Sequence, residues 1–338
     1  MPKFSVVIPI YNTIQWIDRC LESIRIQTFT DFEALLVDDG STDGSVAVCK
    51  KYAEIDKRFR LVCGTHAGPA AARNLGIRNA KGDYILFVDS DDEVEQNYFN
   101  NLQDAIGSDH PDICYVTRHF VVEKDKMKEY AVLQNVDEGE LYTSQQFLEI
   151  CVAQHRGIPS SSCIIIFQRK FGQQNNIYMD ESMEWSEDAD FSYHLFSKSD
   201  TIKVCNKPAY FWHRDNGETL SNRMTFERLS ARMNHYIKWS KYYADSHNFP
   251  KQYDKKALLG FSEWLRGEYC NYLHMPGIMR DRNIEIKMLH KLKADKAFWE
   301  KSNRSDIVIY RKCGLRIGCY YNKLKRWKGK LLGIFKKG

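Results

Sequence analysis

The sequence predicts an α/β fold in which a mostly parallel sheet carries helices on both faces. Two observations support this class. Short apolar runs alternate with segments of helical spacing over the first hundred or so residues, and the most apolar run ends in a group of acids. The composition is that of an ordinary globular protein, with 43% hydrophobic and 28% charged residues among 338. A chain of this length exceeds one small core, so we expect an additional unit or extension.

The expected elements follow one another in a regular order. The apolar runs that predict strands are Phe4–Ile10, Phe32–Val37, Leu61–Cys63 and Tyr84–Val88. Segments with helical spacing lie between them, over residues 14–24, 46–53 and 69–80. Pro69 is well placed for the first turn of the third helix, because its missing N–H costs nothing there. Strand–helix–strand order of this kind favours parallel strands with crossover helices.

The run Tyr84–Val88 is apolar enough to be buried on both faces, and three acids follow it, Asp89, Asp91 and Asp92. Open α/β sheets bind ligands at the carboxyl ends of their strands. Grouped carboxylates repel one another unless a cation or hydrogen-bond donors offset the repulsion, and a hard divalent ion carrying a phosphorylated ligand would do so. The alternative is that Asp91 and Asp92 only cap a helix expected over Glu93–Gly107.

Charge and cysteine content exclude several classes of protein. The formal net charge is +5, and much of the basic excess lies in the last thirty residues, so the body of the chain gives no case for nucleic-acid binding. The ten cysteines form no CxxC pairs, which predicts free thiols in a reducing compartment. No signal peptide precedes the first strand, and no apolar run approaches the ~20 residues of a membrane span. We therefore expect a cytoplasmic protein.

Four ordered blocks of sequence carry a family resemblance: SVVIPIYN, LLVDDGSTDGS, AGPAAARNLGIRNAKGDYILFVDSDD and WSEDADF. Together they resemble the family 2 inverting glycosyltransferases of the GT-A fold, which use nucleotide-sugar donors. The resemblance covers roughly the first 220 residues, and four blocks in order are far more specific than any single motif. It implies a GT-A transferase domain over residues 1–220.

The resemblance implies a nucleotide site at the ends of the first strands. Pro9 and Tyr11 would border the nucleobase, and Asp39 would accept the imide N–H of uracil, which is the argument for UDP. Arg73 matches an arginine that contacts the nucleotide in relatives, although an arginine on a helix can instead pair with an acid. His66 stands where relatives often have Asn, and it can still donate or accept a hydrogen bond.

Other polar residues of these blocks have simpler interpretations. Asn12 is expected to cap the first helix, and Asp38 to support the loop that follows the second strand. Ser41, Thr42 and Asp43 are expected, at least in part, to satisfy backbone amides of the turn and of the next helix start.

The resemblance also implies a metal site. Asp89 would contact the ribose or the metal, and Asp91 would coordinate Mn²⁺ or Mg²⁺ bridging the diphosphate. His213, in the segment YFWHR, stands where relatives often have a residue that reaches the metal or diphosphate. Its alternative is a packed, hydrogen-bonded histidine. The polar loop over residues 215–221 would close over bound donor.

The pair Glu187–Asp188 precedes a helical pattern marked by Phe191 and Leu195. In the family the Asp of this pair is the general base, so the resemblance gives Asp188 that role, with Glu187 beside it. Helix capping explains Asp190 better than it explains Asp188.

The resemblance fades after residue 222. The pattern over residues 221–310 predicts helices. We expect this region to pack on the transferase domain and to contribute to the choice of acceptor. Residues 311–338 contain ten Lys or Arg and no acid, with aromatic residues on one helical stripe. That pattern predicts a basic amphipathic tail on an anionic membrane surface, at the inner face of the cell membrane. The alternative is a solvated basic end.

These observations together predict an inverting, metal-dependent hexosyltransferase. It would move a hexose from a UDP-sugar to a hydroxyl of a lipid-linked surface polysaccharide or oligosaccharide. The missing membrane spans argue against a processive synthase that extrudes its own polymer. A sugar nucleotidyltransferase is an alternative, although no Gly-rich triphosphate loop is visible. A second alternative is a nucleotide-sugar-binding module without catalysis.

Overall fold

The computed structural model describes residues 1–124, 126–154, 161–183, 186–207 and 209–214. All of them belong to one compact unit, Met1–His235. The predictions for the loop over 215–221, the helical region over 221–310 and the basic tail over 311–338 lie outside the described residues. No helix in the described part of the chain is long and apolar enough to cross a membrane.

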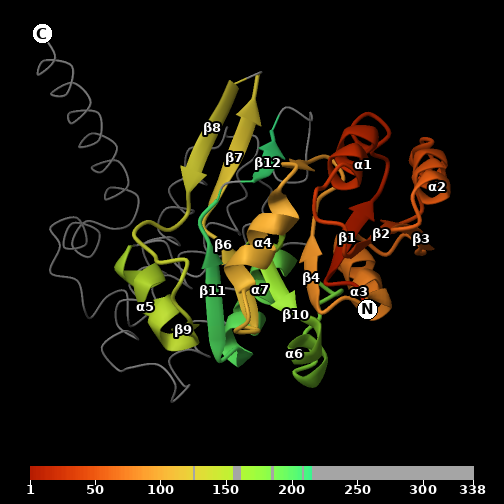
Figure 1. Cartoon of the computed structure of the whole chain (residues 1–338). Coiled ribbons are helices and arrows are strands. Elements are labelled where there is room, and N and C mark those ends of the chain that lie inside the picture. Colours follow the sequence, from red (N-terminus) through yellow and green to blue (C-terminus); the bar gives the residue numbers. More distant parts are fainter. Residues whose placement is uncertain (125, 155–160, 184–185, 208, 215–338) are drawn as a thin grey trace, which may run out of the picture. The chain divides into compact units, whose positions relative to one another are not determined.

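The main sheet has the strand order β3-β2-β1-β4-β10-β6-β11-β9 (Figure 1). Its strands are β1 Phe4–Ile10, β2 Phe32–Asp38, β3 Phe59–Cys63, β4 Tyr84–Phe87, β6 Ile113–Val116, β9 Tyr142–Thr143, β10 Ile165–Gln168 and β11 Thr201–Cys205. The pairs among β1, β2, β3 and β4 are parallel, as is the pair of β6 with β11. Strand β10 runs antiparallel between β4 and β6, and β9 runs antiparallel at the edge. The predicted mostly parallel sheet is confirmed.

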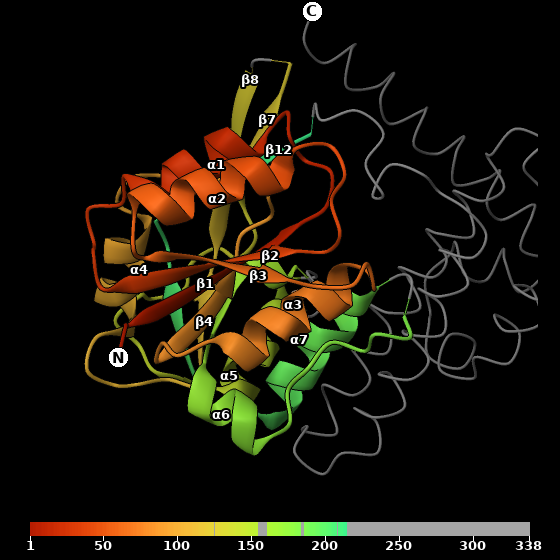
Figure 2. The ribbon, with the colours of Figure 1, turned by 90° about the vertical axis from the view of Figure 1, so that its right-hand side faces the viewer.

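Helices cover both faces of this sheet. They are α1 Ile17–Arg25, α2 Ser45–Ile55, α3 Pro69–Asn79, α4 Tyr98–Ile106, α5 Ser144–Ala153, α6 Arg169–Gln174 and α7 Glu187–Lys198, with a short 3-10 helix η1 over Ser162–Ile164. Figure 2 shows α1 and α2 on one side of the β1–β3 part of the sheet and α3 on the other. The expected helices of the first half therefore lie where the pattern placed them, with boundaries shifted by a few residues.

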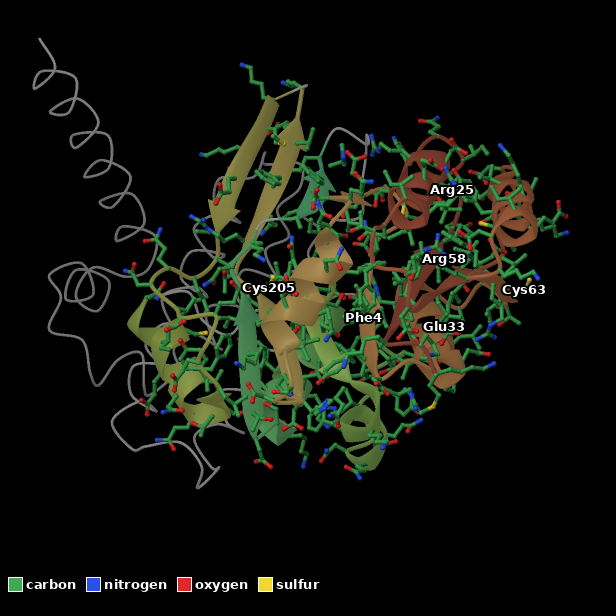
Figure 3. The ribbon with its side chains drawn as sticks, viewed as in Figure 1. Phe4, Arg25, Glu33, Arg58, Cys63 and Cys205 are labelled. Atoms are coloured by element: carbon green, nitrogen blue, oxygen red, sulfur yellow. The ribbon has the colours of Figure 1, made fainter. Side chains whose placement is uncertain are left out.

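The core lies between these layers, and its strands are apolar on both faces because helices cover both. Phe4 at the start of β1 is fully buried, whereas Cys63 at the end of the edge strand β3 is exposed (Figure 3). Helix α3 packs unusually close to β1. A Cβ on Gly76 would lie 2.2 Å from a methyl carbon of Val7, so only glycine allows this approach.

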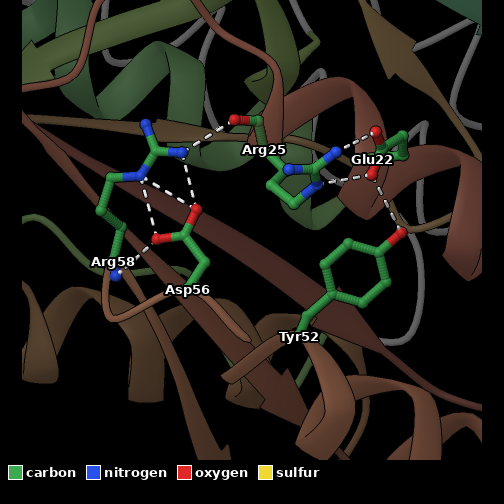
Figure 4. Close-up of polar contacts among 5 residues, drawn as sticks. All are labelled: Glu22, Arg25, Tyr52, Asp56 and Arg58. Atoms are coloured by element: carbon green, nitrogen blue, oxygen red, sulfur yellow. Dashed lines mark hydrogen bonds and ion pairs between the residues drawn. The ribbon is translucent and has the colours of Figure 1, made fainter. Parts of the chain in front are cut away.

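A polar network joins α1 to the loop before β3 (Figure 4). Glu22 receives two hydrogen bonds from Arg25, of 2.6 and 2.7 Å, and a third of 3.4 Å from the hydroxyl of Tyr52. Arg58 pairs with Asp56 at 2.6 Å and also donates to the backbone carbonyl of Arg25 at 2.7 Å. The network fixes the helical layer against the outer strands, away from the acids that follow β4.

A second, smaller sheet extends beyond the carboxyl end of β4, in the order β5-β12-β7-β8. Its strands are β5 Glu93–Val94, β7 Arg118–Glu123, β8 Lys126–Ala131 and β12 Tyr210–His213. The expectation of one helix over Glu93–Gly107 is wrong in its first part, because residues 93–94 pair with β12 and the helix α4 begins only at Tyr98. Local spacing could not reveal this, since the partner strand lies more than a hundred residues away.

Candidate active site

The predicted site residues gather at the carboxyl edge of the main sheet, where β4 ends. Strand β10 contributes to the same edge in an unusual way. Because it runs antiparallel to β4, its beginning, not its end, lies beside the acids that follow β4. The residues just before β10 are those of η1, which include Ser162. Helix α7 begins nearby with Glu187 and Asp188 in its first turn, as predicted.

Arg73 joins the two acidic motifs. Its guanidinium donates a 2.7 Å hydrogen bond from Nη2 to Oδ1 of Asp89, and its Nη1 lies 3.7 Å from Oδ1 of Asp188. The arginine side chain is 7% exposed, whereas each acid keeps 34% of its side-chain surface exposed. Ser162 completes the group by donating a 2.9 Å hydrogen bond to Oδ1 of Asp188. We call these four residues the acid–arginine cluster.

The cluster perturbs the ionisation of its members. Burial raises the pKa of Asp188, and the charge of Asp89 adds to this rise, while Arg73 and the Ser162 hydroxyl act against it. Burial, followed by the charge of Asp188, also raises the pKa of Glu187 to about 7. Burial alone would lower the pKa of Arg73, but the two acids outweigh it and raise it, so the guanidinium stays charged. A carboxylate with a raised pKa is a stronger base.

The sequence groups Asp92 with Asp89 and Asp91 at the ligand-binding edge of the sheet, but the Asp92 side chain is buried instead. It is 2% exposed, and its carboxylate accepts hydrogen bonds from the Tyr210 hydroxyl at 2.7 Å and from the backbone N–H of His213 at 2.9 Å. Its pKa lies well above the usual range because of burial and the charges of Asp89 and Asp91.

The alternative that Asp91 and Asp92 cap the following helix is wrong, because α4 starts at Tyr98 with Asn97 before it. Asp92 instead ties the loop after β4 to the second sheet. Asp89 and Asp91 are half-buried.

Asp39 lies at the end of β2 in a socket of backbone amides. Its two carboxylate oxygens each accept a 2.8 Å hydrogen bond, from the N–H of Ala67 and of Gly68. Asp38 supports the same loop, as expected, by accepting from the amides of Gly40 and Ser41 at 3.1 and 3.2 Å. Each carboxylate oxygen has a second lone pair, so Asp39 can accept one more donor.

Two exposed rings stand beside this socket. Tyr11 follows β1 directly, and its ring stacks on that of His66 with centroids 4.5 Å apart and planes inclined by 25°. Nδ1 of His66 lies 3.2 Å from the backbone carbonyl of Asp39. Pro9 lies within β1, opposite Val37 of β2. The structure thus brings Tyr11, His66 and Asp39 together at one end of the sheet.

Asn12 has a different role from the one expected. It does not cap α1, which begins at Ile17, and its side-chain oxygen accepts a 2.8 Å hydrogen bond from the N–H of Thr42. Ser41 and Asp43 accept from the amides of Asn12 and Ile14, at 3.0 and 2.9 Å. The turn residues therefore satisfy backbone amides, as expected, and they join the loop after β1 to the loop after β2.

His213 points its Nε2 at Glu93, with 2.9 Å to the carboxylate, and its side chain is 10% exposed. In the part of the chain that the structure describes, no three His, Cys, Asp or Glu side chains converge as a metal cage. The donor set still fits a hard cation, because Mg²⁺ and similar ions are commonly held by one or two carboxylates together with water and substrate phosphates. Asp89 and Asp91 supply such carboxylates.

Sequence reasoning missed two members of the site. Ser162 contacts Asp188 although it lies in no recognisable motif, and Tyr210 was noted only as part of an aromatic segment. Nothing local in the sequence marks either residue, since both reach the acids through long-range strand placement. The weak signal that was available is a hydroxyl residue three positions before an apolar strand, as Ser162 stands before Ile165–Gln168.

Known proteins resemble this chain in sequence and in fold. The sequence model of the family "Glycosyl transferase family 2" matches residues 5–173, which are half of the chain. The chain belongs to glycosyl transferase family 2, and the predicted family and class of enzyme are thereby confirmed.

The glycosyltransferase GlyA of Streptococcus pneumoniae is 35% identical over 147 residues, which are 44% of this chain and 21% of that protein. The poly(ribitol-phosphate) beta-N-acetylglucosaminyltransferase TarS of Staphylococcus aureus is 28% identical over 230 residues, 66% of this chain and 37% of that protein. The chain thus spans less than half the length of these two relatives.

The crystal structure of S. aureus TarS 1-349 in complex with UDP-GlcNAc has a TM-score of 0.69 to this chain at 19% identity. The alignment covers 96% of this chain and 92% of that one. At this level of identity the likeness establishes the fold, and it confirms the predicted GT-A architecture of the α/β core.

Proposed function

We propose that this protein is an inverting glycosyltransferase that moves a hexose from a UDP-sugar to a hydroxyl group of a saccharide. The observation that carries the proposal is the acid–arginine cluster. Arg73 holds Asp89, at the end of β4, and Asp188, at the start of α7, on one guanidinium. A donor diphosphate beside Asp89 would therefore lie close to a carboxylate able to accept a proton.

Asp188 is the proposed general base. Both of its contacts in the cluster use Oδ1, from Ser162 at 2.9 Å and Arg73 at 3.7 Å, which orients the carboxylate. The proton of the acceptor hydroxyl would pass to Oδ2 as the hydroxyl oxygen forms its bond to the anomeric carbon. The bond from that carbon to the UDP oxygen breaks on the opposite side, and UDP leaves with the bonding electron pair. Attack opposite the leaving group inverts the anomeric configuration.

The proposed donor is a UDP-sugar. Asp39 supports it, because a carboxylate already fixed by two amides can accept the imide N–H of uracil, a donor that cytosine lacks. Tyr11 and His66 offer aromatic faces beside Asp39 on which a base can stack. The fold shared with TarS, whose crystal structure holds UDP-GlcNAc, also supports this donor class.

A divalent cation, Mn²⁺ or Mg²⁺, is the proposed cofactor, with Asp89 and Asp91 as the residues that would hold it and His213 as a further candidate. When bound, such an ion neutralises negative charge on a departing diphosphate. Arg73 would keep Asp89 in place in its absence, because the 2.7 Å contact offsets the repulsion among neighbouring acids.

The acceptor and the cellular location are proposals from the sequence pattern. We propose residues 1–220 as the transferase domain and 221–310 as the region that contributes to acceptor choice. Residues 311–338 would hold the enzyme on the anionic inner face of the membrane, near a lipid-linked polysaccharide intermediate.

The decisive experiment measures UDP release from a panel of UDP-sugars with Mn²⁺ and a membrane extract as the source of acceptor. The Asp188→Asn variant should retain UDP binding and lose turnover by ~100-fold or more. Asp200→Asn is the matched control, because the exposed Asp200 precedes β11 at the opposite edge of the sheet, and it should turn over like the wild type.

Other results would contradict the proposal. Full turnover by Asp188→Asn would exclude the base assignment. Binding of UDP and Mn²⁺ without release of UDP from any donor would favour a nucleotide-sugar-binding module, and release of diphosphate from a sugar 1-phosphate and a nucleoside triphosphate would favour a nucleotidyltransferase. Retention of configuration in the product would exclude single-step inversion.

A further inference from the structure

The second sheet carries three rings in a row that the cluster does not use. His119 of β7 stacks on Tyr130 of β8, with centroids 6.0 Å apart and planes inclined by 13°. On its other side His119 lies 6.2 Å from the ring of Trp212 of β12. The three side chains lie on one face of the sheet. His119 is paired with Tyr130 across β7 and β8. Trp212 is paired with Val121, which lies two residues after His119 on β7 and therefore points to the same side. We call these three residues the aromatic row.

Both ends of the aromatic row are open to solvent. Trp212 is 40% exposed and Tyr130 is 39% exposed, which is unusual for large rings that lie next to each other on one sheet face. A cation lies over each outer ring. The guanidinium of Arg214 is 4.6 Å from the Trp212 ring centroid, and Nζ of Lys128 is 4.9 Å from that of Tyr130. The surface is therefore aromatic along its length and positive at both ends.

The central histidine has an unsatisfied polar atom. Nδ1 of His119 is buried and has no hydrogen-bond partner in the described structure. Burial, together with the charge of Arg214, lowers the pKa of this histidine, which favours the neutral ring. With the central ring neutral, the positive charge of the row lies at its two ends, on Arg214 and Lys128.

The aromatic row continues directly into the active site. Tyr210 precedes Trp212 by two residues on β12, so the two side chains leave the strand on the same face, about 7 Å apart along it. The hydroxyl of Tyr210 accepts from the N–H of Asp89 at 3.2 Å and donates to Asp92 at 2.7 Å. The strand that carries Trp212 therefore also fixes the loop with the acids after β4.

We propose that the aromatic row is a binding subsite for the acceptor, and that this acceptor is a saccharide chain bearing negative charges. Arg214 and Lys128 attract phosphate or carboxylate groups of the chain, and the exposed parts of Trp212 and Tyr130 beside them offer apolar surface to the C–H bonds of its sugar rings. The role as an acceptor subsite rests on the proposed function, whereas saccharide binding does not.

Affinity electrophoresis tests binding without a donor, using native gels that contain hyaluronate, which bears carboxylates, or neutral dextran. Hyaluronate should retard the wild-type chain more than dextran does. Trp212→Leu should weaken the apparent affinity about three- to tenfold, and Trp212→Phe should preserve most of it. Lys128→Gln should weaken retention by hyaluronate only. Tyr178→Leu is the matched control, since Tyr178 also lies under a cation, Arg78, at 5.9 Å, but far from the second sheet, and it should behave as wild type.

Two outcomes would overturn the inference: no retention of the wild type by either gel, or equal retention of Trp212→Leu. A loss of concentration-dependent self-association in Trp212→Leu, measured by sedimentation, would assign the row to a contact between copies of this chain instead.

The proposed function is measured separately through UDP release with membrane extract. If UDP is released but the extract concentration needed for half-maximal release is the same in Trp212→Leu, the acceptor role is wrong. If no UDP is released while retention depends on Trp212, the proposed function fails and the binding surface stands.

Discussion

The hydroxyl of Tyr210 lies 2.7 Å from Oδ2 of Asp92, and both groups are buried. One residue belongs to the second sheet and the other to the loop after β4, so this hydrogen bond fixes the loop that carries Asp89 and Asp91. The Tyr210 oxygen also accepts from the N–H of Asp89. A single phenol therefore sets the backbone position of the acids proposed to meet the donor.

Removal of that phenol should destabilise the protein. Tyr210→Phe leaves the Asp92 carboxyl and the Asp89 amide each short of a partner, at an expected cost of about 1–3 kcal/mol in the free energy of unfolding measured in urea. Tyr98→Phe is the matched control. Among the described residues the buried hydroxyl of Tyr98 has no hydrogen-bond partner, so its loss should cost nothing or stabilise slightly. Equal losses in both variants would contradict the assigned role of Tyr210.

The acid side of the pH–rate profile should depend on Ser162. Its hydroxyl stabilises the charged form of Asp188, so Ser162→Ala should raise the pKa of Asp188 further and move the acidic limb of kcat/KM to higher pH. Ser192→Ala removes another buried hydroxyl that donates to Asp188, but to its backbone carbonyl at 2.7 Å, and it should leave the limb in place. An unchanged limb in Ser162→Ala would separate Asp188 from the proton transfer.

Glu187 should make stability depend on pH. Its pKa is raised from 4.5 to about 7, so the folded state favours its protonated form. That contribution to stability is fully present below about pH 4.5 and is lost as the pH rises through about 7. Gln imitates the protonated form at every pH. Glu187→Gln should therefore raise the thermal midpoint little at about pH 4.5 and by about 2–6 °C at about pH 8.

The control for this titration is Glu54→Gln, an exposed position on α2, whose thermal midpoint should differ from the wild type by the same small amount at both pH values. A Glu187→Gln effect that does not grow with pH would show that Glu187 is not protonated in the folded protein near neutral pH.

Base preference should follow Asp39. In Asp39→Asn one oxygen becomes an NH₂ that faces the amide of Ala67 or Gly68, and the acceptor for the uracil imide is weakened. UDP affinity, measured by calorimetry, should fall about tenfold or more beyond any fall in CDP affinity, because only uracil also loses its acceptor. Asp38→Asn perturbs the same loop through Gly40 and Ser41, so it should weaken both nucleotides alike. An unchanged ratio in Asp39→Asn would refute the uracil assignment.

Binding of Mn²⁺ should be coupled to binding of UDP. Because the described part of the chain offers two carboxylates without a third converging ligand, Mn²⁺ alone should bind weakly and UDP should tighten its binding about tenfold or more. Asp91→Asn should abolish this coupling, as followed by electron paramagnetic resonance of free Mn²⁺. Asp104→Asn, with a side chain 70% exposed on α4, is the control. Tight binding of Mn²⁺ without UDP would indicate a preformed site.

The first half of the fold was accessible from the sequence because its elements are local and strongly periodic. Strand β1 over Phe4–Ile10 was predicted with its observed ends, and Pro69 does begin α3. Helix α7 was predicted from the spacing of Phe191 and Leu195. In each case one segment determines its own structure, and tertiary contacts only reinforce it.

The second sheet was not accessible, since it depends on pairing between distant short segments. Glu93 and Val94 follow acids and precede a helix, so the local pattern continues the helix into them, and only the pairing with β12 overrides it. The same reason explains Asn12. Its position before a helix predicts a cap, but the nearby Thr42 amide, supplied by another loop, is the stronger partner.

The strand order has a consequence for how the protein becomes functional during synthesis. The parallel strands β1 to β4 and their helices all come from the first ninety or so residues, so the half of the sheet that carries the proposed nucleotide site can assemble while the ribosome is still translating. Strand β10 and helix α7 are made much later, and β10 must insert between β4 and β6 before Ser162 and Asp188 reach Arg73. A nascent chain would thus form the proposed donor site well before the proposed base, Asp188, reaches Arg73.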